Sequence, residues 1–273
     1  MIRNKAKEKI RRGDIAFGSE IMFPSPDVAE ILGYAGMDFV YLDMEHSATT
    51  LESLVHMVRA AEIGGATPLV RIPETLPGNY AGTILPLLDL GAMGVIVPHI
   101  ESGTQARAVV EAVKYHPLGR RGMFDVGRQS GYGFTMSGPD YVRQANEETL
   151  IVLMIESREG VEQLEDILRV EGVDTILIGT SDLSQSLGCP GQLTAAPVLE
   201  AIERIQKACR AGGVACGVGS FASYPPELTS RFMANGVGFI NINANNIISA
   251  GVRHWRDWLA RTDGLRVKPA TTK

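Results

Sequence analysis

The hydrophobic residues of this chain follow two alternating patterns. Eight short runs are almost continuously apolar, and most of the segments between them repeat hydrophobic residues every three or four positions. The first pattern is typical of parallel strands buried on both faces, and the second is typical of amphipathic helices. The expected strands are residues 16–21, 38–43, 68–72, 94–98, 150–156, 175–179, 214–219 and 238–242.

The helical segments also begin and end with suitable capping residues. Residues 25–36 open with Ser25 and close with Gly36, which suit the N-cap and the C-cap of a helix. Eight strand–helix units in 273 residues predict a (β/α)8 TIM barrel, a fold that typically takes about 250 residues. A doubly wound open sheet usually has fewer strands and is the second choice.

We expect a single domain over residues 1–273, with the barrel core at about 14–258. Residues 1–14 are basic and are followed by no long apolar stretch, so they predict a short solvated helix that caps the domain and not a secretory signal. The residues after 258 are expected to form a C-terminal tail.

The composition argues against several classes of protein. The net charge is −5 and no stripe of Lys and Arg stands out, so nucleic acid is not an expected partner. No apolar run approaches the roughly 18 residues of a membrane-spanning helix. The three cysteines, Cys189, Cys209 and Cys216, form no CxxC motif, which favours free thiols and a cytoplasmic location.

Four of the expected strands end at residues with catalytic side chains. In either candidate fold, the carboxyl ends of the strands face one side of the sheet, where active sites lie. We therefore expect these side chains to meet in one cavity. They are Asp43, Glu45, His46, Arg71, Glu156 and Asp182.

Glu156 and Asp182 could together bind a divalent cation through their carboxylate oxygens, with positions left for water and substrate. Each could instead cap a helix, because a helical pattern follows directly after both residues. Their matched positions on strands that follow one another favour the metal site.

Arg71 would be costly to bury without a partner. Its planar fork could bind a carboxylate or polarise a carbonyl, or it could pair with an acid at another strand end. His46, beside Asp43 and Glu45, is of the type that transfers protons near neutral pH. Alternatively, His46 could be a structural histidine partnered by Asp43, or a metal ligand. His99 could line the same cavity.

Other kinds of site find little support. None of the seven lysines lies at an expected strand end, which disfavours Schiff-base chemistry. The chain has no dinucleotide fingerprint, P-loop or nucleophile elbow. The long irregular segment 116–140 is expected to act as a lid or to lie at a subunit contact.

Seven motifs in one order resemble the HpcH/HpaI aldolases, which are metal-dependent class II pyruvate aldolases. Each motif is weak by itself, but the resemblance runs from about residue 5 to about 258. The motifs are LDMEH (42–46), VRIP (70–73), LLDLGAMGVIVPHIES (87–102), YHPLGRRG (115–122), YVRQANEE (141–148), MIESREG (154–160) and IGTSDLSQSLG (178–188).

The resemblance implies a (β/α)8 barrel and a homohexamer, a trimer of dimers that exchange their last helix. It also implies a divalent cation such as Mg, Mn or Co, held by Glu156 and Asp182. Arg71 would contact the 2-oxo group and the enolate.

The resemblance further implies that His46 moves protons through water, supported by Asp43 and by the partner subunit's Asp89. Local pattern alone would make Asp89 an exposed or interface residue. The backbone of residues 179–181, which are Gly179, Thr180 and Ser181, would hold the substrate carboxylate. In the long segment, Arg128 and Tyr132 would face the far end of the substrate.

Some positions depart from the family pattern. Thr180 stands where Pro is usual, Met154 where Gln is frequent, and residues 241–246 have Asn where an acid is often found; His99 is also atypical. The metal, Arg and His positions are kept. Because of these departures, the resemblance determines neither the identity of the substrate nor the water network around the site.

The expected reaction is the reversible cleavage of a 4-hydroxy-2-oxo acid into pyruvate and an aldehyde. The acid would chelate the metal, the His46 unit would remove the 4-hydroxyl proton, and metal and Arg71 would stabilise the enolate. The alternatives are a citryl- or acyl-CoA lyase, a citrate-synthase-like enzyme, and an inactive protein that binds 2-oxo acids. The sequence names neither the aldehyde, the metal nor the pathway.

Overall fold

Eight parallel strands form a closed barrel in the computed structural model, which describes residues 3–76 and 78–262. Each strand pairs with the next, and β8 pairs with β1. This closure confirms the predicted TIM barrel and excludes the open sheet. The strands are β1 (Ala16–Ile21), β2 (Phe39–Asp43), β3 (Thr67–Arg71), β4 (Gly94–Val97), β5 (Leu150–Ile155), β6 (Thr175–Ile178), β7 (Ala215–Val218) and β8 (Val237–Asn243).

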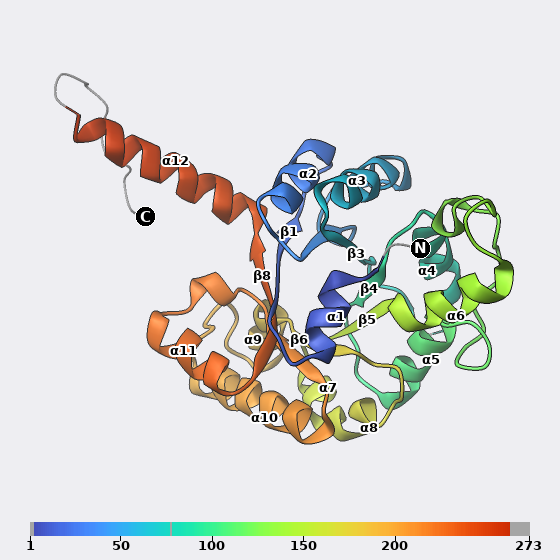
Figure 1. The fold of residues 1–273 in the computed structure, drawn as a ribbon. Coiled ribbons are helices and arrows are strands. Elements are labelled where there is room, and N and C mark those ends of the chain that lie inside the picture. Colours follow the sequence, from blue (N-terminus) through green and yellow to red (C-terminus); the bar gives the residue numbers. More distant parts are fainter. Residues whose placement is uncertain (1–2, 77, 263–273) are drawn as a thin grey trace.

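Helices surround the barrel and connect its strands (Figure 1). Those on the periphery are α2 (Pro26–Tyr34), α3 (Leu51–Gly64), α4 (Tyr80–Asp89), α5 (Gly103–Val113), α6 (Gly138–Glu148), α7 (Arg158–Glu162), α8 (Leu164–Leu168), α10 (Ala196–Gly212) and α11 (Pro226–Ala234). Two helices at the chain ends, α1 (Lys5–Arg11) and α12 (Ala244–Ala260), and the short elements α9 (Thr180–Ser186), η1 (Arg128–Ser130) and η2 (Phe221–Ser223) complete the structure.

The strands are apolar at nearly every position because both of their faces are buried. In β2, Phe39 and Tyr41 belong to the hydrophobic cluster inside the barrel, whereas Val40 and Leu42 belong to the layer between the barrel and the helices. Phe39 stacks on Phe239 from β8, with ring centroids 4.3 Å apart. Removing such a buried ring typically costs about 3–5 kcal/mol of stability.

The predicted caps explain where several helices begin. The Ser25 hydroxyl accepts a hydrogen bond from the Val28 N–H, at 3.3 Å, at the start of α2. Thr50 and Ser53 form a capping box that starts α3. Gly36, just after α2, has a φ of 98°, a backbone conformation that glycine adopts without strain.

The N-terminal helix α1 lies against the barrel and contributes to its interior. Ala6 is fully buried in the cluster inside the barrel, and Lys7 donates hydrogen bonds to the Thr149 carbonyl and to Asp174. The expectation of a solvated helix therefore holds for only part of α1, because Ala6 and Lys7 face inward.

The last helix, α12, projects away from the barrel (Figure 1). Four large apolar side chains on it are half or more exposed: Ile248, Val252, Trp255 and Trp258. The expected C-terminal tail lies mostly outside the described residues. Among the residues that the structure describes, no helix is both long and apolar enough to cross a membrane.

Candidate active site at the barrel mouth

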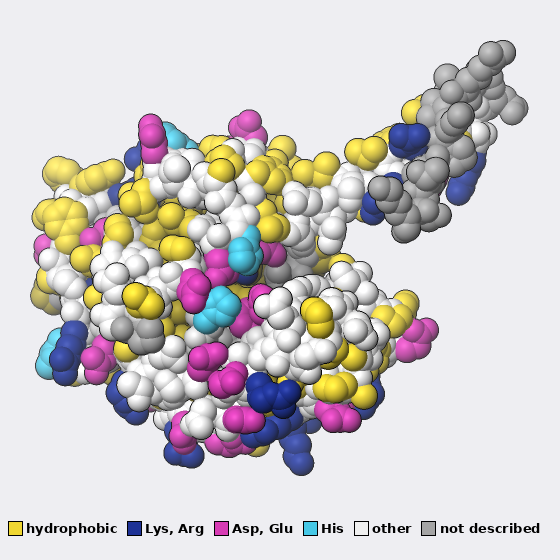
Figure 2. Space-filling model, turned by 180° about the vertical axis from the view of Figure 1, so that it is seen from behind, with side chains coloured by type: hydrophobic (Ala, Val, Ile, Leu, Met, Phe, Trp, Pro, Cys, Tyr) yellow, Lys and Arg dark blue, Asp and Glu magenta, His cyan; other side chains and the backbone are white. Residues whose placement is uncertain are grey.

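A cavity of about 210 Å³ opens at the carboxyl ends of the strands. It brings together most of the residues predicted from the sequence, although they come from four different strands or the loops after them. Those that line it are His46, Arg71, Glu156, Gly179, Thr180, Ser181 and Asp182. Histidine and acidic side chains also gather near the centre of the face shown in Figure 2.

Arg71 is buried at the end of β3 and is surrounded by three carboxylates. Its Nε lies 2.8 Å from Asp43 Oδ1 and 3.3 Å from Glu45 Oε2, and its Nη2 lies 3.1 Å from Glu20 Oε1. Burial alone would lower the pKa of Arg71, but the hydrogen bond to Asp43 and the neighbouring negative charges raise it above its usual value. The guanidinium is therefore a permanently charged, fixed group.

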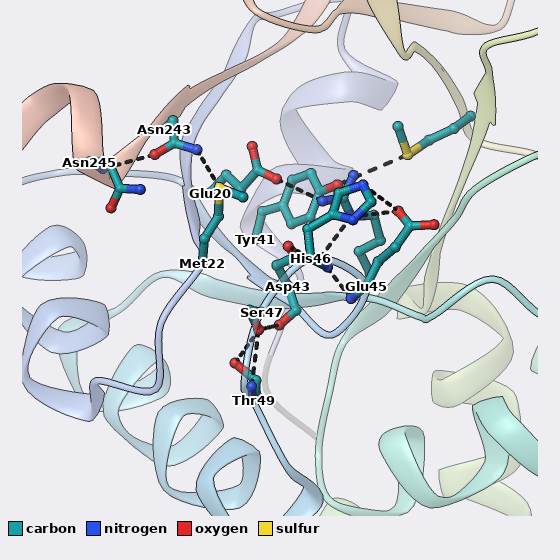
Figure 3. Close-up of polar contacts among 12 residues, drawn as sticks. Glu20, Met22, Tyr41, Asp43, Glu45, His46, Ser47, Thr49, Asn243 and Asn245 are labelled. Atoms are coloured by element: carbon teal, nitrogen blue, oxygen red, sulfur yellow. Dashed lines mark hydrogen bonds and ion pairs between the residues drawn. The ribbon is translucent and has the colours of Figure 1, made fainter. Parts of the chain in front are cut away.

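Asp43 organises the turn that carries His46. Its two carboxylate oxygens accept hydrogen bonds from the N–H groups of Glu45, at 3.0 Å, and of His46, at 3.2 Å (Figure 3). The carboxylate close to the imidazole is instead that of Glu45, whose Oε2 lies 3.7 Å from His46 Nε2. In this structure Asp43 thus positions the backbone of the turn and Arg71, rather than the imidazole itself.

Glu156 is buried, with only 3% of its surface exposed, and lines the cavity just after β5. Its Oε1 accepts a hydrogen bond from the His99 N–H at 2.7 Å. Burial raises the pKa of Glu156 to about 6, although the His99 hydrogen bond lowers it, and the charges of Glu45 and Asp182 raise it further. A buried carboxylate close to a second one is a typical donor set for a divalent cation.

Gly179 provides the space that Glu156 occupies. A Cβ atom at position 179 would overlap the Glu156 carboxylate and lie 2.7 Å from its Cβ. Asp182 follows in the first turn of α9 and lines the same cavity. The chemistry of this oxygen donor set fits a hard or borderline divalent cation.

His99 lies between two of the acids at the mouth. Its Nδ1 is 3.5 Å from Glu156 Oε1, and its Nε2 is 3.5 Å from Glu45 Oε1. Its backbone has a φ of 54°, in the left-handed region that non-glycine residues rarely adopt. The His99 imidazole therefore lies between Glu156, the predicted metal ligand, and Glu45, which is beside His46.

Two predicted residues lie elsewhere in this single chain. Asp89, at the end of α4, accepts a hydrogen bond from Arg121 Nη2 at 2.7 Å. Arg128 forms an ion pair with Glu62 and a hydrogen bond to the Leu90 carbonyl, and lines a separate cavity. Neither residue lines the mouth cavity of its own chain.

Several residues at the mouth were not predicted from the sequence, among them Glu20, Asn241 and Asn243. Glu20, near the end of β1, contacts Arg71 and lines the cavity, and Asn241 and Asn243 of β8 line the cavity as well. The signal for Glu20 was a charged residue inside an otherwise apolar strand. The signal for Asn241 and Asn243 was the departure from the family pattern at residues 241–246. Without the barrel, the sequence did not show that these side chains line the mouth cavity.

A closed barrel with a carboxylate pair, an arginine and a histidine at its catalytic end defines a TIM-barrel enzyme. Residues 22–245 match the profile of the HpcH/HpaI aldolase/citrate lyase family, and the chain belongs to that family. This membership confirms the resemblance found in the motifs. It also makes the protein a carbon–carbon lyase, as predicted.

Named relatives and solved structures are similar along nearly the whole chain. A 2-keto-3-deoxy-L-rhamnonate aldolase from Salmonella gallinarum is 33% identical over 249 residues, which are 91% of this chain and 90% of that protein. The HpcH/HpaI aldolase of Desulfitobacterium hafniense is 28% identical, with a TM-score of 0.83 over 95% of this chain and 98% of that one. The citrate synthase SbnG is 31% identical, with a TM-score of 0.78 over 93% of this chain and 95% of that one.

Proposed function

We propose that this enzyme is a metal-dependent class II aldolase that reversibly cleaves a 4-hydroxy-2-oxo acid into pyruvate and an aldehyde. The observation that carries the proposal is the meeting of Glu156 and Asp182 with Arg71 and His46 around one cavity. The similarity to a 2-keto-3-deoxy-L-rhamnonate aldolase supports the same reaction class.

Glu156 and Asp182 would hold the divalent cation, which we propose to be Mg, Mn or Co. A bound cation of this kind supplies Lewis-acid polarisation of the 2-oxo group. The fit rests on the buried position of Glu156 and on the space that Gly179 leaves for its carboxylate.

The start of α9 would bind the substrate carboxylate. Gly179, Thr180 and Ser181 line the cavity at this helix start, where the first N–H groups of a helix have no intrahelical acceptor. The Thr180 hydroxyl would not bind the substrate carboxylate, because its Oγ1 donates a hydrogen bond to the Gly219 carbonyl at 3.2 Å.

Arg71 would stabilise the negative charge that develops on the 2-oxo oxygen. Its contacts with Asp43, Glu45 and Glu20 hold the guanidinium in one orientation before the substrate binds. A donor that is already oriented pays little reorganisation energy during the reaction, which makes electrostatic stabilisation effective.

His46 would accept the proton of the 4-hydroxyl group through a water molecule. The C3–C4 bond then breaks, its electron pair forms the pyruvate enolate, and the aldehyde leaves. Protonation of the enolate at C3 gives pyruvate. The imidazole is half exposed and lies beside Glu45, which suits a group that exchanges protons with water.

We also propose that the enzyme is a hexamer, a trimer of dimers with exchanged α12 helices. The projecting helix exposes Trp255 and Trp258, and the α2 and α3 surface exposes Ile31, Tyr34 and Ile63. Contact between such surfaces would bury both. A role of the partner subunit's Asp89 at the mouth is a separate part of the proposal. The three free cysteines support a reducing compartment such as the cytoplasm.

A citrate-synthase-like reaction is the second candidate, favoured by the similarity to SbnG. It would need cations near the mouth for the phosphates of coenzyme A. Arg120, Arg121 and Arg128 are the arginines of the long segment, and each already pairs with an acid: Glu111, Asp89 and Glu62, respectively. This pairing favours the aldolase.

The test is a panel of 4-hydroxy-2-oxo acids coupled to a pyruvate assay, with a coenzyme A thioester and oxaloacetate as a parallel arm. Metal-dependent pyruvate release is the expected result. Release of free coenzyme A without any pyruvate formation would favour the second candidate instead.

A further inference from the structure

The helix α1 closes the amino end of the barrel, opposite the mouth (Figure 1). The Asn4 side chain, at the N-cap of α1, donates a hydrogen bond to the Met93 carbonyl at 2.9 Å, just before β4. Ala6 is fully buried in the hydrophobic cluster inside the barrel. The docking of α1 therefore seals the barrel interior at this end.

Two buried lysines meet where α1 contacts the barrel. Lys7 belongs to α1 and Lys114 is the C-cap of α5, and each is only 3% exposed. Lys7 Nζ donates a hydrogen bond to the Thr149 carbonyl at 2.7 Å, and Lys114 Nζ donates to the same oxygen at 2.9 Å. Because both nitrogens contact one oxygen, two amino groups that are ordinarily positively charged lie close together and away from water. We call Lys7 and Lys114 the lysine pair.

The lysine pair has one carboxylate as its countercharge. Asp174 Oδ2 lies 2.8 Å from Lys7 Nζ, and it also accepts a hydrogen bond from the Ile151 N–H at 2.9 Å. Lys114 Nζ donates instead to the Asn146 carbonyl at 2.7 Å, and within the described part of the chain it forms no ion pair. A buried charge without a countercharge is costly, so two buried cations beside one acid favour the loss of one proton.

The other charged groups near the lysine pair do not supply the missing negative charge. Arg11 of α1 and Glu147 of α6 face one another at 3.9 Å, and Glu111 of α5 lies 3.6 Å from Arg120. Glu148 of α6 accepts a main-chain hydrogen bond from the start of α1 at 2.7 Å. A cavity of about 390 Å³ adjoins the pair, and its other charged lining residues are Arg11, Arg107, Glu111, Glu171 and Asp174. Each acid in this lining either pairs with another cation or is exposed to water.

We propose that the lysine pair makes the docking of α1 depend on pH: α1 is held tightly when Lys114 is an uncharged amine, and it opens more often when both lysines carry a proton. Two like charges repel strongly where water is excluded, whereas an uncharged Lys114 amine can accept a hydrogen bond from the Lys7 ammonium. The inference concerns the end of the barrel away from the candidate active site, and it does not rest on the proposed aldolase function.

The direction of the effect follows from the pKa of Lys114. Burial and the charge of Lys7 lower this pKa to about 7 from its ordinary value of 10.5, although the Asp174 carboxylate raises it. Between these two values, the unfolded chain holds a proton that the folded chain has lost, so the contribution of Lys114 to stability increases as the pH rises. Below about pH 7 the amine is protonated in both states, and this contribution is constant at its lowest level.

The test is hydrogen–deuterium exchange of the α1 amides, measured between pH 6 and pH 9 and corrected for the intrinsic effect of pH on exchange. The protection factor of an amide reports how often its segment opens. We expect the protection of α1 to be constant up to about pH 7 and then to rise, by at most about tenfold for each pH unit. Protection that stays flat over the whole range would overturn the proposal.

Two substitutions at position 114 isolate the effect of the proton. Lys114→Met is uncharged at every pH, so the rise in protection should disappear. Lys114→Arg is charged at every pH, so protection should stay at the low level that the wild type shows below pH 7. Lys207→Met is the matched control, because Lys207 lies exposed on α10, and it should keep the wild-type profile.

A rise that persists in both variants would assign the titration to another group and overturn the role of Lys114. If neither variant folds, Lys7→Met decides the question. Without the second cation the pKa of Lys114 should increase, so the rise in protection should begin at a higher pH, and an unchanged profile would overturn the proposal. The exchange measurements involve no substrate and no metal, so none of these results bears on the aldolase function.

Discussion

Gly179 lies directly against the side chain of Glu156, so closely that even a methyl group at position 179 would overlap the carboxylate. The end of β6 is thereby shaped to receive an acid from β5. The same turn begins α9, which carries Asp182. One missing side chain thus allows two acids from successive strands to line a common cavity.

We predict that Gly179→Ala weakens metal binding by at least about tenfold, which corresponds to about 1.4 kcal/mol. The added methyl group would push the Glu156 carboxylate out of its position. Isothermal titration with Mn²⁺ measures the effect. Gly212→Ala, at the exposed end of α10, is the control, because a Cβ there meets only the Leu168 Cβ, at 4.0 Å, and should leave affinity unchanged. Unaltered affinity in the Gly179 variant would show that Glu156 does not hold the cation.

Asp182→Ala should abolish measurable Mn²⁺ binding and pyruvate release together. A site with a single protein carboxylate lacks the charge to hold a divalent cation against water. Electron paramagnetic resonance measures the free hydrated Mn²⁺, and the bound ion follows by difference from the total. Glu159→Ala, at an exposed position in α7, should bind the ion normally. Stoichiometric binding by the Asp182 variant would refute the carboxylate pair.

Arg71 should affect both catalysis and stability. Arg71→Lys keeps the charge but loses the planar fork that contacts Asp43, Glu45 and Glu20, so we expect kcat to fall about a hundredfold. Arg71→Ala would leave the fully buried Asp43 without its charged partner, at a cost of about 3–5 kcal/mol. Urea unfolding measures this loss. A kcat within twofold of wild type for the lysine variant would contradict the proposed role.

Metal binding should depend on pH through Glu156. Burial raises the pKa of this group to about 6, so protons compete with the cation as the pH falls through that value. We expect affinity to be constant above about pH 7 and to fall up to about tenfold for each unit below 6. Titrations of Mn²⁺ between pH 5 and 8 test this, and a flat profile would contradict it.

The same raised pKa predicts the sign of a stability change in the metal-free protein. Between its ordinary pKa of 4.5 and its folded pKa of about 6, Glu156 keeps a proton that the unfolded chain has lost. The contribution of Glu156 to stability therefore decreases as the pH rises through this window. Urea unfolding of the metal-free wild type and of Glu156→Gln isolates the effect, since the variant should lack it.

The strands and their chemistry were largely predictable from sequence. The eight apolar runs match the eight observed strands to within about a residue or two at each end, the usual uncertainty of such boundaries. Buried parallel strands leave a continuous apolar signal, and the rule that strand ends converge placed Arg71, Glu156 and Asp182 together.

Other parts of the site were not predictable because they depend on contacts between distant segments. Glu20 gains its role only when β1 lies beside β2 and close to Arg71. Asn241 becomes an unpartnered acceptor only when β8 closes the barrel against β1. For Arg128, position in a long segment gave no indication that Glu62 would be its partner.

The most direct test is the rate of pyruvate release from a 4-hydroxy-2-oxo acid before chelator, after chelator, and after a divalent cation is added back. We predict loss of activity with chelator and recovery with Mg²⁺, Mn²⁺ or Co²⁺. Undiminished pyruvate release by thoroughly chelated enzyme would contradict a carboxylate-held cation at the mouth of this barrel.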